Sequence, residues 1–109
     1  MMKGSDRMNG LLSVIIPAYN EQEMIPKAAA TIAEILEQAE ISYELLFVND
    51  GSRDLSWQCI EEAADQNPSI RGLNFSRNFG KESAMFAGLS EAVGDCVVVI
   101  DCDLQNPPE

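Results

Sequence analysis

The chain has 109 residues, a length that fits one small domain, and 46% of them are hydrophobic, as in a globular protein. With 18 acidic and 7 basic residues the net charge is −11, which repels phosphate backbones and argues against a nucleic-acid partner. The sequence has no histidine, which excludes mechanisms based on a histidine base or a histidine-ligated metal. No apolar run approaches the ~18 residues of a membrane span.

The first ten residues, MMKGSDRMNG, lack the apolar core and cleavage site of a secretory signal. We therefore expect residues 1–10 to be a flexible leader and the domain to occupy residues 11–109. The three cysteines are few, odd in number and without metal-ligand spacing, which favours a reducing, cytoplasmic location.

Apolar runs and helical periodicity alternate along the chain. Strands are predicted, in chain order, at residues 11–17, 43–49, 70–76 and 95–101. Between them we expect a helix from about Pro26, a second helix capped by Ser52 or Asp54, and a third that ends at Gly94. The third helix is expected to bury a stripe made of Met85, Phe86, Leu89, Ala92 and Val93. This alternation predicts an α/β fold, a Rossmann-like three-layer α/β/α arrangement around a parallel sheet.

A polar cluster follows each predicted strand. The clusters are PAYNE (17–21), NDGS (49–52), SRNFGKE (76–82) and DCDLQ (101–105). In open parallel sheets ligands bind beyond the carboxyl ends of the strands, where all four clusters would meet. The sequence therefore predicts a ligand site at this edge of the sheet.

Asp101 and Asp103 are the candidate metal ligands. On an extended backbone the two side chains share one face, with Cα atoms roughly 6.6 Å apart, and Cys102 points the opposite way. Converging carboxylates repel one another unless a cation lies between them, and oxygen ligands favour Mg²⁺ or Mn²⁺. Gln105 could add a neutral oxygen. The alternative is a pair of strand-end or turn aspartates.

Two further clusters could hold a nucleoside. Asp50 could accept hydrogen bonds from a base or a ribose, with Gly51 allowing close approach, or it could belong to a plain turn with a helix cap. Tyr19 could stack on a base and Glu21 could accept from its N–H groups, unless this loop simply forms a capping box.

Arg77 and Lys81 are two of only 7 basic residues, and they flank one loop beside the acidic cluster. They suit a diphosphate, although ion pairs with neighbouring acids would also explain them. The segment GKES lacks the first glycine of a P-loop, because Phe75 occupies that position. No G-x-G-x-x-G follows the first strand, so a dinucleotide cofactor is not expected.

Four segments together, SVIIPAYNE, FVNDGSRD, NFSRNFGKESAMFAGL and VVVIDCDLQNPPE, resemble family 2 glycosyltransferases. The nearest branch looks like the polyprenyl-phosphate sugar transferases, of the dolichol-phosphate mannose synthase and bactoprenol glucosyltransferase type. The resemblance covers residues 11–109. It departs at Asn49, where the family often has an acid, at Cys102, where a small residue is usual, and at Asn106.

The resemblance implies a nucleotide-diphospho-sugar transferase (GT-A) fold with strand order 3-2-1-4. It also implies a nucleoside pocket and a metal site with a nearby ribose. The implied nucleotide-sugar-binding residues are Pro17, Tyr19, Glu21, Asp50, Arg77, Gly80, Lys81 and Asp101, and the implied metal ligands are Asp101, Asp103 and Gln105.

In function, the resemblance implies an inverting, Mg²⁺- or Mn²⁺-dependent enzyme that moves a sugar from a UDP- or GDP-sugar to an acceptor. For this branch the acceptor is a polyprenyl phosphate, reached at the cytoplasmic face of a membrane, as in cell-wall or polysaccharide synthesis. It names no catalytic residue within this sequence. Family members continue well beyond the metal motif, so the sequence corresponds to the donor-binding half.

Two other functions are compatible with the sequence. One is a non-catalytic nucleotide-binding module. The other is a haloacid-dehalogenase-type phosphatase, although Gln105 stands where that motif needs Thr or Val. The apolar run Val97–Val99 further predicts an exposed edge strand and a homodimer formed through it.

Overall fold

The computed structural model describes residues 10–103, and its centre is a four-stranded parallel sheet. The strands are β1 (Leu12–Ala18), β2 (Tyr43–Asn49), β3 (Ile70–Asn74) and β4 (Cys96–Val99). Their order is β3-β2-β1-β4, as the resemblance implied, with β1 pairing β2 along its whole length. The predicted leader, apart from Gly10, and the candidate ligand Gln105 lie outside the described residues.

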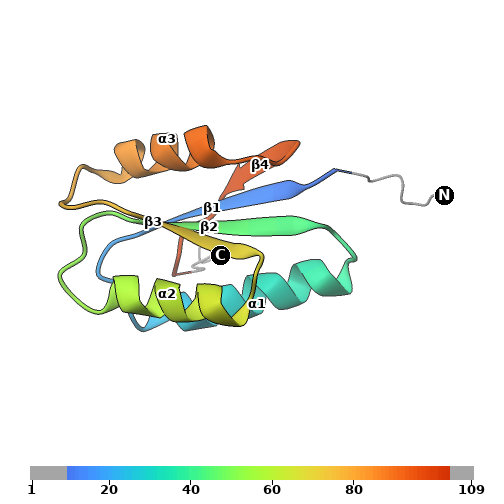
Figure 1. The fold of residues 1–109 in the computed structure, drawn as a ribbon, viewed down its shortest axis with the longest axis horizontal. Coiled ribbons are helices and arrows are strands. Elements are labelled where there is room, and N and C mark those ends of the chain that lie inside the picture. Colours follow the sequence, from blue (N-terminus) through green and yellow to red (C-terminus); the bar gives the residue numbers. More distant parts are fainter. Residues whose placement is uncertain (1–9, 104–109) are drawn as a thin grey trace, which may run out of the picture.

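Helices cover both faces of the sheet and make three layers (Figure 1). Helices α1 (Met24–Gln38) and α2 (Ser56–Gln66) lie on one face, and α3 (Lys81–Glu91) lies on the other. The predicted α/β class and three-layer arrangement are confirmed. Within residues 10–103, no helix combines the length and the apolar character needed to cross a lipid bilayer.

The core lies on both sides of β1 and β2. Every residue of β2 is buried, which explains why this strand is an almost continuous apolar run. The larger core cluster fills the space under α1 and α2, and a smaller one, formed by Ile15, Val48 and Ala84, lies under α3. The rigid centre of the sheet therefore supports the loops that follow β1 and β2.

The ends of the first two helices differ slightly from the prediction. Helix α1 begins at Met24, so Pro26 is its third residue, where a missing N–H still leaves no helical bond unmade. The N-cap of α2 is Leu55, so neither Ser52 nor Asp54 caps this helix as predicted. The carboxylate of Asp54, just before the N-cap, accepts a hydrogen bond from the Ser56 amide at 2.9 Å.

The prediction for α3 was wrong about its buried face. The helix ends at Glu91, before Gly94, and its buried residues are Ala84 and Gly88. Phe86, Leu89 and Val93 are instead exposed, at 71%, 49% and 70%. Two small residues let the helix approach the sheet so closely that a Cβ on Gly88 would lie 2.5 Å from Ile15.

Candidate functional site

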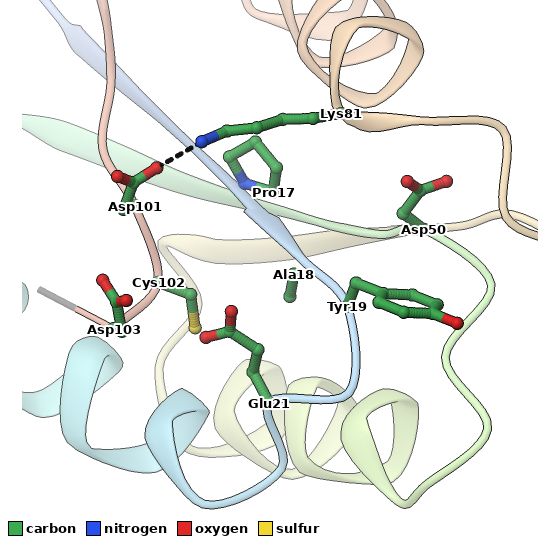
Figure 2. A pocket seen from close by; sticks show the side chains of 9 residues that line it. All are labelled: Pro17, Ala18, Tyr19, Glu21, Asp50, Lys81, Asp101, Cys102 and Asp103. Carbon is green, nitrogen blue, oxygen red and sulfur yellow. Dashed lines mark hydrogen bonds and ion pairs between the residues drawn. The ribbon is translucent and has the colours of Figure 1, made fainter.

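A cavity of about 210 Å³ lies at the carboxyl ends of the strands, the edge that the sequence predicts (Figure 2). Strand β1, the loops after β1 and β2, the start of α3 and the segment after β4 all contribute to it. It is lined by Pro17, Ala18, Tyr19, Glu21, Asp50, Lys81, Asp101, Cys102 and Asp103. Among the predicted residues, Arg77 and Gly80 do not line this cavity. The binding roles assigned to these residues stay predictions.

The loops that follow β1 and β2 are held together by hydrogen bonds. The Asn20 amide donates to Ser52 Oγ at 2.8 Å, and the Glu21 amide donates to Ser56 Oγ at 2.9 Å. In return, Asn20 Oδ1 accepts from the Arg53 amide at 2.8 Å. The Asn20 side chain thus links the two loops instead of capping α1, which has no side-chain cap. These bonds fix the backbone that carries Tyr19 and Glu21 into the cavity.

Asp50 follows β2 and is only 4% exposed. Its carboxylate accepts hydrogen bonds from the loop before α3, from the amides of Phe79 and Gly80 at 2.8 and 3.1 Å. In the same loop the Arg77 guanidinium lies 4.8 Å from the centre of the Phe79 ring, a cation–π contact. Arg77 therefore contacts its own loop and is not among the residues that line the cavity.

Lys81 is the first residue of α3 and the only basic residue that lines the cavity. Its Nζ lies 2.8 Å from Oδ1 of Asp101 (Figure 2). The hydrogen bond to Asp101 and the charge of that carboxylate raise the pKa of Lys81. The ion-pair alternative for Lys81 is therefore present in the structure, and it joins the start of α3 to the segment after β4 across the cavity.

Glu21 contributes a partly buried carboxylate to the cavity. Its Oε1 is buried and has no hydrogen-bond partner among the described residues. Burial raises the pKa of Glu21, a hydrogen bond with the Cys102 thiol lowers it, and the charges of Asp103 and Asp101 raise it further. Burial and the neighbouring Glu21 likewise raise the pKa of the Cys102 thiol, which is therefore a poor nucleophile.

The local geometry predicted for Asp101 and Asp103 was wrong. Strand β4 ends at Val99 and residues 102–103 form a turn, so the alternation of an extended strand does not apply. Both aspartates nevertheless line the cavity, and Figure 2 shows Cys102 beside Glu21. Cys102 is 1% exposed and packs into the larger core cluster while also lining the site. Sequence reasoning missed Cys102 and Ala18 as lining residues because side-chain alternation was the only guide.

The charges of the cavity lining do not balance. It carries the carboxyl groups of Glu21, Asp50, Asp101 and Asp103 but only the ammonium group of Lys81. Within residues 10–103, no three acidic or cysteine side chains converge closely enough to hold a metal by themselves. Asp101 and Asp103 do offer the hard oxygen donors that Mg²⁺ and Mn²⁺ prefer, and such ions usually keep positions for water and substrate phosphates. The donor chemistry thus fits a divalent cation that a ligand helps to bind.

Several curated proteins are similar in sequence. A prophage bactoprenol glucosyl transferase homolog from Escherichia coli is 44% identical over 98 residues, which cover 90% of this chain and 32% of that protein. An undecaprenyl-phosphate 4-deoxy-4-formamido-L-arabinose transferase from Proteus mirabilis is 43% identical over 99 residues, covering 90% of this chain and 30% of that protein. The chain thus spans about a third of the length of these relatives.

Solved structures share the fold. A mannosyltransferase from Pyrobaculum calidifontis in complex with GDP-Man and Mn²⁺ matches with a TM-score of 0.74 and 25% identity, over 86% of this chain and 28% of that one. A mannosyl-3-phosphoglycerate synthase from Rubrobacter xylanophilus matches with a TM-score of 0.77 and 20% identity, over 95% of this chain and 34% of that one, and shows the fold alone. Finally, the family model described as glycosyl transferase family 2 matches residues 13–109, and the chain belongs to this family.

Proposed function

We propose that the cavity binds a nucleoside-diphosphate sugar together with Mg²⁺ or Mn²⁺, and that the protein transfers the sugar to a polyprenyl phosphate with inversion. The observation that carries the proposal is the excess of carboxylates over ammonium groups in the cavity lining. A diphosphate would be repelled from such a site unless a cation came with it. The similar mannosyltransferase from Pyrobaculum calidifontis, described with GDP-Man and Mn²⁺, supports the same combination.

Each part of such a donor has suitable residues. Pro17, Tyr19 and Glu21 would hold the nucleoside, and the Glu21 carboxylate, whose Oε1 has no hydrogen-bond partner within residues 10–103, would accept a hydrogen bond from a base. Lys81 would face the diphosphate, with Arg77 as a second cation from the loop. Asp101 and Asp103 would hold the cation, together with Gln105, which lies outside the described residues.

The transfer needs little help from a protein base. An oxygen of the acceptor phosphate forms a bond to the anomeric carbon as the bond to the diphosphate breaks, and the electron pair leaves with the nucleoside diphosphate. A phosphate monoester has a second pKa of about 6, so it is largely ionised at neutral pH. When bound, the cation would offset charge on the departing diphosphate. A sequence without histidine is compatible with this chemistry.

Calorimetry tests the metal requirement directly. UDP-glucose and GDP-mannose are titrated into the chain with and without Mn²⁺, and we expect one of them to bind only when Mn²⁺ is present. The Asp103→Ala variant should lose this Mn²⁺ response, while Asp65→Ala, which removes the same charge at an exposed position of α2, should keep it. An Asp103→Ala variant that binds as the parent does would show that the metal assignment is wrong.

A release assay separates transfer from binding alone. The chain is incubated with the donor that binds and with undecaprenyl phosphate, and free nucleoside diphosphate is measured. Release that depends on the lipid supports the transferase, whereas binding without release supports the alternative of a nucleotide-binding module. A lipid acceptor and a nucleotide donor would place the reaction at the cytoplasmic face of a membrane, which agrees with the three free cysteines.

We also propose that two copies associate through β4. Among the described residues this strand pairs with β1 alone, and its Val97, Val98 and Val99 are 38%, 41% and 41% exposed. An unpaired apolar edge favours pairing with another chain. Asp95 and Asp101 flank the strand, so the association should strengthen as salt screens these charges.

Light scattering at several protein and salt concentrations measures this association. Val98→Lys should abolish it, because a charged side chain on an edge strand opposes pairing. Ile35→Lys, at an apolar side chain on α1 that is 59% exposed, is the matched control and should leave it intact. A monomer under all conditions, or equal effects of both variants, would contradict the proposed dimer.

A further inference from the structure

The ion pair between Lys81 and Asp101 joins two residues that the proposed function assigns to different ligands. Lys81 Nζ lies 2.8 Å from Asp101 Oδ1, while Lys81 is proposed to face the diphosphate and Asp101 to hold the cation. A cation on Asp101 would therefore either replace the ammonium group or lie beside it on one carboxylate. The second arrangement brings two positive charges together, and these repel one another. The ammonium group and the cation are thus competitors for Asp101.

The ion pair is suited to exchange. The side chains of Lys81 and Asp101 are 61% and 57% exposed, and ion pairs between exposed side chains contribute little free energy. Lys81 is the first residue of α3, so the helix holds its backbone, whereas its flexible four-carbon stem lets the ammonium group turn to another anion. Figure 2 shows this stem crossing the cavity from the start of α3 to the segment after β4. Little free energy is therefore lost when the ammonium group leaves Asp101 for a second anion in the cavity.

Lys81 also supplies the positive charge that the carboxyl groups of the cavity share. No other basic side chain within residues 10–103 lines the cavity, and the charges of Asp103 and Glu21 attract the ammonium group in addition to Asp101. The ammonium group thus weakens the attraction of this cluster for a divalent ion that arrives alone. A diphosphate changes the balance, because its oxygens accept hydrogen bonds from an ammonium group and also bind Mg²⁺ or Mn²⁺.

We propose that Lys81 is an exchangeable counter-ion of the candidate metal site: its ammonium group neutralises Asp101 and moves to the diphosphate when a nucleoside diphosphate binds, which leaves Asp101 for the cation. The competition for Asp101 is based on the ion pair, and the move to the diphosphate rests on the proposed function. Because breaking one ion pair prepares the site for both ligands, each ligand strengthens the binding of the other, and this coupling is reciprocal. Removing the ammonium group should therefore have opposite effects on the two ligands.

Binding of Mn²⁺ alone tests the competition for Asp101. Electron paramagnetic resonance measures free Mn²⁺ during titration of the parent chain and of Lys81→Met. Loss of an exposed ion pair predicts roughly three- to fivefold tighter Mn²⁺ binding by Lys81→Met. Lys81→Arg, which keeps the charge, should bind Mn²⁺ as the parent does.

Lys27→Met is the matched control for net charge. It removes the same charge at an exposed position of α1 that does not line the cavity, so it should leave Mn²⁺ binding unchanged. Mn²⁺ binding that Lys81→Met does not tighten, or that Lys27→Met tightens equally, would overturn the proposal.

Nucleotide binding tests the exchange. UDP or GDP, whichever the parent binds, is titrated by calorimetry at low and at saturating Mn²⁺. At saturating Mn²⁺, Lys81→Met should bind the nucleotide roughly tenfold more weakly, because a hydrogen bond to a charged group is lost. The gain in nucleotide affinity from low to saturating Mn²⁺ should also be smaller in Lys81→Met than in the parent, by roughly three- to fivefold. A lysine that only contacted the diphosphate would leave this gain unchanged, and that result would overturn the exchange.

The outcomes also separate this role of Lys81 from the proposed function. A parent that binds neither UDP nor GDP with Mn²⁺ would overturn the proposed function and with it the move of Lys81 to the diphosphate. The titration with Mn²⁺ alone would still decide the competition for Asp101. Mn²⁺-dependent nucleotide binding by the parent, together with an unchanged Mn²⁺ affinity of Lys81→Met, would support the proposed function and overturn the counter-ion role.

Discussion

Strand β2 carries a buried carboxylate at each end, and both carboxylates hold the same helix. Asp50, just beyond the carboxyl end, accepts the amides of Phe79 and Gly80, which precede α3. Glu44, near the amino end, accepts the amide of Val93 at 2.9 Å, two residues beyond the end of α3. The two residues are 4% and 7% exposed. One strand thus fixes both ends of one helix by similar means.

The surroundings of the two carboxylates differ. Glu44 also accepts from Ser13 Oγ at 2.6 Å and pairs with the Arg71 guanidinium at 3.1 Å. The donors to Asp50 are uncharged amide groups, and its carboxylate lines the cavity. At the amino end of β2, the charged partner of Glu44 satisfies a carboxylate that has a structural role. At the carboxyl end of β2, the Asp50 carboxylate has no such partner within residues 10–103 and borders the cavity, which leaves room for a ligand. A hydrogen bond from a buried carboxylate to a helix end therefore does not show whether that carboxylate is structural or functional. The groups that surround the carboxylate have to be known as well.

We expect the largest effect on stability from substitution of Glu44, at the amino end of β2. Glu44→Ala removes the acceptor of Ser13, Arg71 and the Val93 amide together, which should lower the free energy of unfolding by about 2 kcal/mol. Urea unfolding measures this, and Glu61→Ala on exposed α2 should change it by less than about 0.5 kcal/mol. Nucleotide binding by the folded Glu44→Ala variant should match the parent. A loss of nucleotide affinity in the Glu44→Ala variant would show that the two ends of β2 do not differ in role.

The stabilisation by Glu44 should also depend on pH. Burial raises the pKa of Glu44, but the hydrogen bonds from Ser13, Val93 and Arg71 outweigh burial and hold it below the ordinary 4.5. The folded state then binds fewer protons than the unfolded state, so stability rises with pH in this range. The contribution of Glu44 is complete above about pH 4.5 and is lost as the pH falls through the folded pKa. Glu44→Gln should flatten this dependence in urea unfolding below pH 5.

The fold could be predicted because its signals are local and repeated. The run at 43–49 coincides with β2, since a strand buried on both faces is apolar throughout. Helix α3 shows the limit, because Phe86 and Leu89 are apolar at helical spacing and are nevertheless exposed, and Val93 of the predicted stripe lies beyond the end of the helix. Periodicity finds an apolar face but cannot tell whether small residues on another face bring the helix closer to the sheet.

The sequence predicted the position of the candidate site better than the contacts that its residues make. The rule that ligands bind beyond parallel strands brought Tyr19, Glu21, Asp50 and Lys81 to one edge, where they line one cavity. Nothing in the sequence indicates that Asp50 accepts the amides of residues 79–80, because these bonds join loops 29 and 30 positions apart. Cys102 was misplaced because a turn replaces the strand after Val99.

A third carboxylate, that of the partly buried Glu21, extends the comparison and gives the smallest expected effect. Glu44 has a charged partner and Asp50 has uncharged donors, whereas Oε1 of Glu21 is buried without a partner among the described residues. Asp101 and Asp103 add like charge nearby. Glu21→Gln removes a partly buried negative charge and keeps the side-chain shape, so the free energy of unfolding at pH 7 should rise by about 0.5 kcal/mol. The same variant should bind the nucleoside less well, because an amide is a weaker acceptor than a carboxylate. Paired urea and calorimetric measurements, with Glu61→Gln as the control for net charge, test both halves. A less stable Glu21→Gln would mean that the hydrogen bond with the Cys102 thiol gives this carboxylate a structural role, and Glu21 would then belong with Glu44 rather than with the cavity.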